Sequence, residues 1–560
     1  MCHSVLQFYP SRDIVESVRL VVFKSYWSRC ALFIFLLFLI CVWFVSGRRP
    51  LEHSYTVPYT LPFLKSTIPF AFDGLRFLGS ARRRFPDKAT FRISIVQDDV
   101  YLIQGPKNIS EVFHNAHLTV TRAYSLVLRQ CFGMGQKSVN AYLADTSGSR
   151  QKPIPGSSPR LQDRISFMTH ENLVSGLLKE GLGPASRRFE IQLARSLQAA
   201  NIGDDWIEFA DMAKFFELHL GSSLISTLFG EELLAQHPNF IEDLWEYDKG
   251  VMNLARRLPW LWMPRTYKIR DKLLTSVEKW HSKVLACAGF SQVSDDPEAD
   301  LLWGTKMVRE RYPMLLGATG QDEKSVASTD LAFIWATVTN VIPSSMTLAL
   351  HVFRSQPLLS SLRTSLSQLS PSPTIEDLET VPLLLSMYAE TLRFGVQIHI
   401  PRSAPYHDLH VGGVAIPKNK LIMTNTWLMH TDENTWNTKG GEQPLDHFWA
   451  ERFLVDPKDA TSGPMKMAGS SSTEQNGKGE VYFSTAGLEG AWIPYGGGHH
   501  ACPGRLLAKR IMLLSTAMLI NRFDVEILAD ERALAFDSPR FGFGVRKPRR
   551  PVRFRMRRRK

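Results

Sequence analysis

The segment YGGGHHACPG, residues 495–504, places one cysteine and two histidines among four glycines and a proline. Three kinds of chemistry use a cysteine in such a setting: a structural zinc site, a nucleophilic thiolate, and a thiolate that ligates a haem iron. A zinc site needs four ligands in paired spacing, and the sequence has no second cysteine or histidine cluster to complete one. A nucleophile needs a base and an orienting partner, and the sequence identifies neither.

The haem interpretation uses more of the residues in this segment. Glycines at 496, 497, 498 and 504 would let the backbone pass close to a flat ring and place N–H groups near the sulfur. The segment RLLAKRIMLLSTAMLI that comes next predicts a helix, and Pro503 suits its first turn. Both the N–H groups and the start of that helix would favour the thiolate form of Cys502.

A second group of residues lies earlier in the chain. VPLLLSMYAETLRFG predicts a helix that begins at Pro382, with Glu390 and Arg393 on one face. Arg452, in FWAERF, is a candidate third member, because the guanidinium fork matches a carboxylate. An isolated E-x-x-R pair usually belongs to a solvated helix face. Glu390, Arg393 and Arg452 therefore indicate a functional group of residues only in combination with the cysteine segment.

The order E-T-L-R, then A-E-R-F, then Y-G-G-G-H-H-A-C-P-G resembles the cytochrome P450 family. That family's cysteine loop has the pattern F-x-x-G-x-R-x-C-x-G. Cys502 takes the ligand position, His500 replaces the usual arginine, and the remaining matches are Tyr495, Gly498 and Gly504. The resemblance implies a mainly α fold with small β-sheets, the cytochrome P450 fold, as a single catalytic domain.

The resemblance also implies roles for individual residues. Cys502 would be the axial thiolate of a haem b, and Arg402 would pair with a haem propionate. Glu390, Arg393 and Arg452 would form the family's structural triad. His500 would have to be protonated, or donate as a neutral ring, to serve the propionate as arginine does. The electrons would come from NADPH through a partner, NADPH–cytochrome P450 reductase.

The segment LAFIWATVTNVIPSSMTLALHVF, residues 331–353, predicts a long apolar helix with a polar centre. Pro343 lacks an N–H and would clash with the carbonyl of Thr339, so we expect the helix to kink or open beside Asn340. The alternative is a buried helix whose hydroxyls bond its own carbonyls.

Most cytochromes P450 carry A-G-x-[DE]-T in this helix, where the acid and threonine help deliver protons. Here A-T-V-T-N places Thr339 at the acid position and Asn340 at the threonine position, which makes both candidate catalytic residues. The pattern is similar to the branch that contains sterol 7α-hydroxylases and prostacyclin synthase. That branch includes both monooxygenases and an isomerase.

The uncharged segment CALFIFLLFLICVWFVSG, residues 30–47, predicts a transmembrane anchor after an N-terminal segment 1–29. Basic residues on both sides leave its orientation open. Prolines then recur through residues 48–72, which predicts a stiff hinge before the catalytic domain, 73–545.

The formal net charge is +12, and ten of the last fifteen residues, 546–560, are Arg or Lys. We expect a solvated or membrane-surface tail, with a final strand in part of it, and no nucleic-acid partner. The cysteines are scattered, which fits a reducing compartment.

These features together predict a membrane-anchored haem-thiolate monooxygenase. Its substrate would be a lipophilic small molecule, such as a terpenoid, steroid-like, polyketide or alkaloid intermediate of fungal-type secondary metabolism. We expect a single-pass protein of the endoplasmic reticulum with its catalytic domain toward the cytosol. Two alternatives remain: a haem-thiolate isomerase or dehydratase that needs no dioxygen, and a non-enzymatic, membrane-tethered basic binding protein.

Overall fold

The computed structural model describes residues 32–33, 35–36, 55–59, 64–96, 98–288, 302–370, 373–466 and 479–560. The predicted N-terminal segment 1–29 lies outside the described residues. So does the predicted anchor 30–47, apart from Leu32, Phe33, Phe35 and Leu36, which are helical and exposed.

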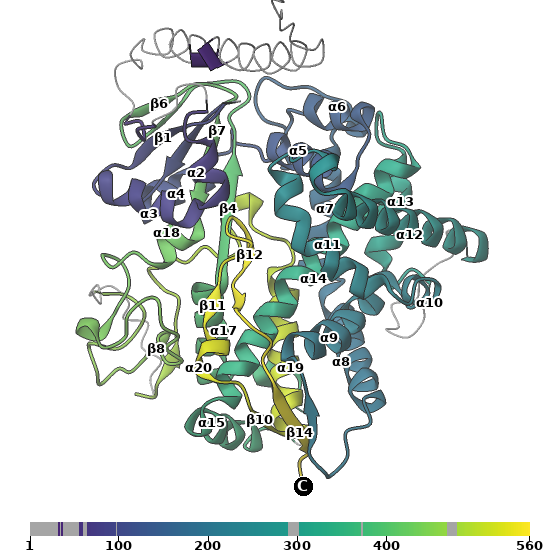
Figure 1. Ribbon diagram of the computed structural model, residues 1–560, viewed down its shortest axis with the longest axis vertical. Helices are drawn as coiled ribbons and strands as arrows, with labels where there is room; N and C mark the ends of the chain where they lie inside the picture. Colours follow the sequence, from purple (N-terminus) through teal and green to yellow (C-terminus); the bar gives the residue numbers. More distant parts are fainter. Residues whose placement is uncertain are drawn as a thin grey trace, which may run out of the picture.

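One long helix, α14 (Glu323–Phe353), runs through the middle of the molecule (Figure 1). It begins with a capping box, in which the Asp322 side chain accepts from Ser325 N at 2.8 Å. It packs against α9 (Met212–Phe229), α12 (Pro264–Ala288), α17 (Pro382–Gly395) and α19 (Arg505–Arg522). Helix α14 is buried on nearly all sides, so apolar residues occur around most of its circumference.

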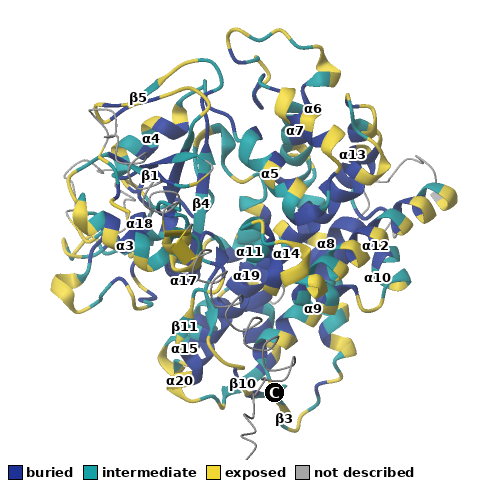
Figure 2. Cartoon of the chain, turned by 45° about the horizontal axis from the view of Figure 1, so that its top comes forward, coloured by how far each residue is buried: buried dark blue, intermediate teal, exposed yellow. Residues whose placement is uncertain are grey.

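Within the described residues, α14 is also the one helix long and apolar enough to cross a bilayer. Its most apolar stretch is 78% buried inside the protein, and Figure 2 shows it in the buried interior. Its composition therefore reflects its place in the core.

The other helices surround these. They are α2 (Thr67–Phe72), α3 (Gly74–Arg84), α4 (Pro106–His114), α5 (Thr121–Phe132), α6 (Gln136–Ala144), α7 (Ile165–Leu178), α8 (Leu182–Ala199), α10 (Glu232–Gln236), α11 (Phe240–Ala255), α13 (Lys306–Leu316), α15 (Gln356–Ser367), α16 (Ile375–Leu378), α18 (Thr426–His430) and α20 (Glu531–Leu534). Short 3-10 turns are η1 (Leu161–Asp163), η2 (Trp260–Trp262), η3 (Lys439–Gly441) and η4 (Gly498–His500).

The strands form small sheets beside the helices. The largest has the order β1-β2-β7-β4-β12 and consists of β1 (Thr90–Ser94), β2 (Asp99–Ile103), β7 (Leu421–Asn425), β4 (Val396–Arg402) and β12 (Phe543–Val545). A three-stranded sheet consists of β10 (Phe523–Ile527), β14 (Phe554–Arg558) and β3 (Ile207–Phe209). The two-stranded pairs are β5 (Leu409–Val411) with β6 (Val414–Ile416), β8 (Leu454–Val455) with β9 (Tyr482–Phe483), and β11 (Phe536–Asp537) with β13 (Lys547–Pro548). The predicted combination of a helical body with small sheets is confirmed.

Two predicted boundaries need correction. The hinge 48–72 is not extended throughout, because its last residues form α2. The tail 546–560 is not separate from the body, since β14 pairs with both β10 and β3. Val552, Phe554 and Met556 alternate with charged residues and are each 1% exposed. Their period of two puts the apolar side chains on the buried face of the sheet and the arginines outside.

Candidate active site

A cavity of about 450 Å³ lies between the middle of α14 and the loop that precedes α19. Helix α14 contributes Ala336, Asn340 and Ser344, and the loop contributes Tyr495 and Cys502. Most of the remaining wall is apolar and comes from α7, α17, β4 and α19, including Leu177, Leu392, Ile400, Leu507 and Ile511. The cavity therefore presents one thiol to a largely apolar space.

Cys502 lies between the 3-10 turn η4 and the first turn of α19. Its backbone N–H donates to the Tyr495 carbonyl at 2.9 Å, which closes the loop. The side chain is accessible from the cavity. The surrounding protein raises the pKa of the thiol above its ordinary value, while a hydrogen bond from the Gly504 backbone and the charge of Arg505 oppose that rise.

Gly497 and Gly498, before Cys502, lie against Phe113 of α4. A Cβ on Gly497 would collide with the Phe113 ring, and a Cβ on Gly498 would collide with the Phe113 carbonyl. Gly498 also has a φ of +61°, which disfavours any other residue. These two glycines allow the loop to pack against α4. Gly496 and Gly504 do line the cavity.

Tyr495, at the aromatic position of the loop, is fixed by a partner that the sequence did not indicate. Its hydroxyl lies 3.1 Å from the hydroxyl of Tyr388, on α17. Burial raises the pKa of both tyrosines, and the nearby Cys502 adds to the rise. The two phenols are therefore neutral and join the cysteine loop to the helix that carries Glu390.

His500 is neutral in the structure. Burial, followed by the charge of Arg402, lowers the pKa of its imidazole to about 3. Nε2 lies 3.0 Å from the Leu118 carbonyl and Nδ1 lies 3.1 Å from the Ser149 hydroxyl. An Nε2–H tautomer satisfies both contacts, with Nε2 donating to Leu118 and Nδ1 accepting from Ser149. The histidine thus has no free donor for a propionate, in contrast to the role expected for it.

Arg402, at the end of β4, is the better candidate for binding an anion. Its side chain is buried, with Nη1 donating to the neighbouring Pro401 carbonyl at 2.9 Å. Nη2 is buried without a partner among the described residues. Burial lowers the pKa of the guanidinium to about 10, so it remains charged at neutral pH. A buried cation without a counter-charge, beside a cavity with one thiol, fits a haem with its propionate.

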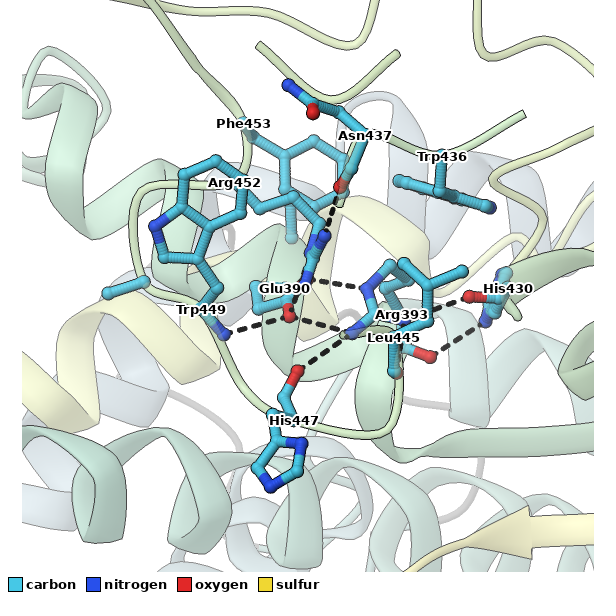
Figure 3. Close-up of polar contacts among 12 residues, drawn as sticks. Glu390, Arg393, His430, Trp436, Asn437, Leu445, His447, Trp449, Arg452 and Phe453 are labelled. Atoms are coloured by element: carbon cyan, nitrogen blue, oxygen red, sulfur yellow. Dashed lines mark hydrogen bonds and ion pairs between the residues drawn. The ribbon is translucent and has the colours of Figure 1, made fainter. Parts of the chain in front are cut away.

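Glu390, Arg393 and Arg452 form one buried network (Figure 3). Arg393 donates to Glu390 through Nε at 2.6 Å and Nη2 at 2.8 Å, and Arg452 donates through Nε at 3.1 Å. The Trp449 N–H adds a further bond to the same carboxylate at 3.0 Å. All three charged side chains are fully buried.

The two arginines of this network also donate to backbone carbonyls. These belong to His430, Asn437, Pro444, Leu445 and His447. The network therefore fastens the segment 430–452 to α17, on which Tyr388 holds the cysteine loop.

On α14, the structure separates the two predicted catalytic residues. Asn340 lines the cavity, whereas Thr339 is fully buried and its hydroxyl donates to the Trp335 carbonyl at 2.8 Å. Thr339 therefore matches the alternative of a hydroxyl bonded to its own helix. Thr337 also lines the cavity, and its hydroxyl donates to the Phe333 carbonyl.

Helix α14 continues through Pro343 without a break, which corrects the predicted opening. The reason lies in Arg540, from the segment between β11 and β12. Its Nη1 donates at 2.8 Å to the Thr339 carbonyl, the group that Pro343 leaves without its helical donor. Its Nη2 lies 3.3 Å from Thr339 Oγ1 and 3.5 Å from Asn340 Oδ1. Arg540 thus replaces the missing helical bond and holds the amide of Asn340.

Arg540 is held in turn by a buried carboxylate on α11. Asp248 Oδ1 lies 3.4 Å from Arg540 Nη1 and accepts from Trp335 Nε1 at 2.9 Å. Lys547 reaches the other oxygen at 3.4 Å. No motif in the sequence connects residues 248, 540 and 547, so only the fold could reveal this cluster.

Comparison with known proteins gives a consistent result. Residues 210–554 match the family model described as cytochrome P450. The chain is 30% identical over 525 residues to cytochrome P450 monooxygenase efuG of Hormonema carpetanum, covering 90% of each chain. It is 22% identical over 346 residues to a 25-hydroxycholesterol 7-alpha-hydroxylase of Rattus norvegicus, covering 59% of this chain and 74% of that one. The solved structure of retinoic acid bound cyanobacterial CYP120A1 superposes with a TM-score of 0.61 at 17% identity, covering 91% of this chain and 100% of that one.

Proposed function

The chain belongs to the cytochrome P450 family and is a haem-thiolate monooxygenase, and from this premise we propose that it oxidises a lipophilic secondary-metabolite intermediate. The observation that supports the proposal is a single one: Cys502 and Asn340 line the same apolar cavity. A terpenoid or steroid-like scaffold suits this cavity best, because the cavity wall consists mainly of aliphatic side chains.

Cys502 would ligate the iron of a haem b, and Arg402 would pair with one of its propionates. When bound, the haem supplies the activation of dioxygen and the transfer of one oxygen atom to the substrate, using two electrons. Burial raises the pKa of the Cys502 thiol, and the Gly504 backbone and Arg505 partly offset that rise. Asn340 offers an amide donor and acceptor at the cavity wall, and we assign it the task of orienting a proton donor there.

The two alternative functions lose their main support. The isomerase hypothesis rested on Asn340, but a relative whose match covers 90% of this chain is named a monooxygenase. The basic binding protein rested on a free tail, and residues 554–558 instead form a strand of the body. Product formation that proceeds without NADPH, reductase and dioxygen would restore the isomerase hypothesis.

The absorption spectrum of the reduced, carbon-monoxide-bound protein tests the proposal. The wild type is expected to show the red-shifted band of a thiolate-ligated haem, and Cys502→Ala to lose it. Cys131→Ala is the matched control, since that thiol is buried away from the cavity in α5 and its pKa is raised to about 12. A wild-type spectrum without the band would refute the assignment of Cys502.

We further propose that residues 30–47 anchor the protein in the endoplasmic reticulum membrane, with the body toward the cytosol and NADPH–cytochrome P450 reductase as electron donor. The 3-10 turn η2 supports membrane contact, because Trp260, Leu261 and Trp262 are 64%, 69% and 73% exposed. Deletion of residues 1–47 is expected to weaken membrane association, and Trp260→Ser in that background to weaken it further. Equal partition of all three proteins into membranes would contradict both parts of this assignment.

A further inference from the structure

A buried arginine on α13 lies on the wall of the same cavity. Arg311 is 1% exposed and lines the cavity together with Tyr124, Leu173 and Phe333. Its guanidinium carbon lies 5.6 Å from the centre of the Phe333 ring. An arginine in such a position either completes an ion pair or has donors left for a ligand.

Arg311 does complete an ion pair, but with only part of its guanidinium. Its Nε donates to Asp330 Oδ1 at 2.8 Å, and Asp330 Oδ2 lies 3.1 Å from His281 Nε2. Asp330 and Arg311 are each 1% exposed, so the pair is closed to bulk solvent. The charge of the guanidinium is therefore already balanced by one carboxylate.

The outer end of the guanidinium has donors to spare. Nη1 is buried and has no hydrogen-bond partner among the described residues. The Tyr124 hydroxyl is a neighbouring polar group on the wall. Burial raises its pKa, and the charge of Arg311 and a side-chain hydrogen bond with Arg311 oppose that rise, so part of the guanidinium already interacts with Tyr124. A buried donor without an acceptor is unfavourable by a free energy comparable to a lost hydrogen bond, so an occupant of the cavity that brings an acceptor is favoured.

The charge balance selects the kind of acceptor. With Arg311 and Asp330 neutralising each other, a ligand carboxylate would bring an uncompensated negative charge into a buried apolar space. A ketone or hydroxyl oxygen would satisfy the donor without that penalty. The arrangement therefore favours a neutral oxygen.

The position along α14 sets the distance. Phe333, beside Arg311, and Asn340 both line the cavity, and their separation along the helix corresponds to about 10 Å at 1.5 Å per residue. Resting on the proposed function, we propose that the substrate already carries a ketone or hydroxyl group that accepts from Arg311, at the end of the cavity about two helical turns from Asn340. Arg311 is then a specificity-determining residue, and the substrate is an elongated scaffold oxygenated by an earlier enzyme.

Equilibrium binding of two matched probes to the haem-loaded enzyme tests this inference. The probes are 5α-androstan-3-one and 5α-androstane, titrated against the haem absorption band, and the measured quantity is the ratio of their dissociation constants. The Arg311→Met/Asp330→Asn double variant removes the donor without leaving an unpaired carboxylate. Lys306→Met, an exposed site on the same helix, is the matched control.

We expect the double variant to shift the ratio about tenfold against the ketone, and the control to leave it unchanged. If the double variant does not retain haem, Arg311→Lys takes its place, since its shorter side chain can pair with Asp330 but withdraws the outer donors. A ratio equal within twofold in wild type and variant would overturn the inference. So would tighter binding of 5α-androstane-3-carboxylate than of the ketone.

The two levels of proposal fail in different ways. A wild type without the thiolate band in its carbon monoxide spectrum refutes the proposed function. A wild type with the band, whose probe ratio does not depend on Arg311, refutes the substrate inference alone.

Discussion

The bond from Arg540 to the Thr339 carbonyl makes a quantitative prediction about α14. Arg540→Met removes that bond and one of the two cations that face Asp248. Pro343→Ala restores an N–H that can bond the same carbonyl within the helix. The two substitutions should therefore be strongly non-additive.

The magnitude depends on the groups that each substitution leaves unpaired. A hydrogen bond from a charged donor contributes about 1.5–3 kcal/mol, and breaking a buried ion pair costs about 3–5 kcal/mol. Because Lys547 remains beside Asp248, we expect Arg540→Met to lower the free energy of unfolding by about 3–5 kcal/mol in total. In the Pro343→Ala background the carbonyl keeps a donor, so the loss should be about 1.5–3 kcal/mol smaller.

Urea unfolding of the haem-loaded protein, monitored by far-ultraviolet circular dichroism, measures all four corners of this double-mutant cycle. The control cycle combines Pro343→Ala with Trp335→Phe in place of Arg540→Met. Trp335→Phe removes a hydrogen bond to Asp248 but leaves the Thr339 carbonyl unchanged. The control cycle should be additive within about 0.5 kcal/mol. If the Arg540 cycle is equally additive, Arg540 does not replace the bond that Pro343 removes.

Three further substitutions test other parts of the molecule. Glu390→Gln leaves two buried guanidinium groups without a counter-charge and should lower the free energy of unfolding by about 3–5 kcal/mol, measured by urea denaturation; a change below about 1 kcal/mol would contradict the network. Burial lowers the pKa of His351 to about 3, so its imidazole is uncharged in the folded protein. Between pH 3 and 6.5 the unfolded chain therefore binds one proton more than the folded protein, and the free energy of unfolding falls as the pH falls. His351→Phe keeps the stacking on Phe448 and should reduce the loss of stability between pH 7 and pH 5 by about 2 kcal/mol; an unchanged pH dependence would refute this. His500→Arg should retain haem, because arginine can still donate to the Leu118 carbonyl as His500 does. A folded variant without haem would contradict the placement of residue 500 beside that carbonyl.

The sequence predicted those features that depend on local pattern. The cysteine loop, the helix with Glu390 and Arg393, and the long apolar helix around Asn340 can all be inferred from spacing and period. The errors arose where a charge could be judged only in three dimensions. The arginines after residue 545 suggested a solvated or membrane-surface tail with a final strand in part of it. That strand is present as β14, but its pairing with both β10 and β3, which joins it to the body, could not be inferred from the charges.

Other parts of the site could not be read from the sequence because their partners lie far along the chain. Ser149 and Leu118 satisfy His500 from segments more than three hundred residues away. Asp248 and Arg540 approach α14 from two other elements, and neither belongs to a recognisable pattern. Hydrogen-bond partners of this kind are selected by the packing of the fold, so a single sequence gives no local signal for them.

The two departures from the family's motifs have the same physical consequence. Where the family has a charged arginine before the cysteine, this chain has a histidine that burial keeps neutral, which leaves Arg402 as the cation that we assign to a propionate. Where the family has an acid in the long helix, this chain has the neutral Thr339, whose carbonyl accepts from Arg540. In both cases a neutral group stands at the family's charged position, while Arg311 on the cavity wall is charged and paired with Asp330. Because Arg311 is already paired with a carboxylate, the cavity accommodates an uncharged substrate oxygen at lower desolvation cost than a substrate carboxylate, which agrees with the acceptor inferred for Arg311.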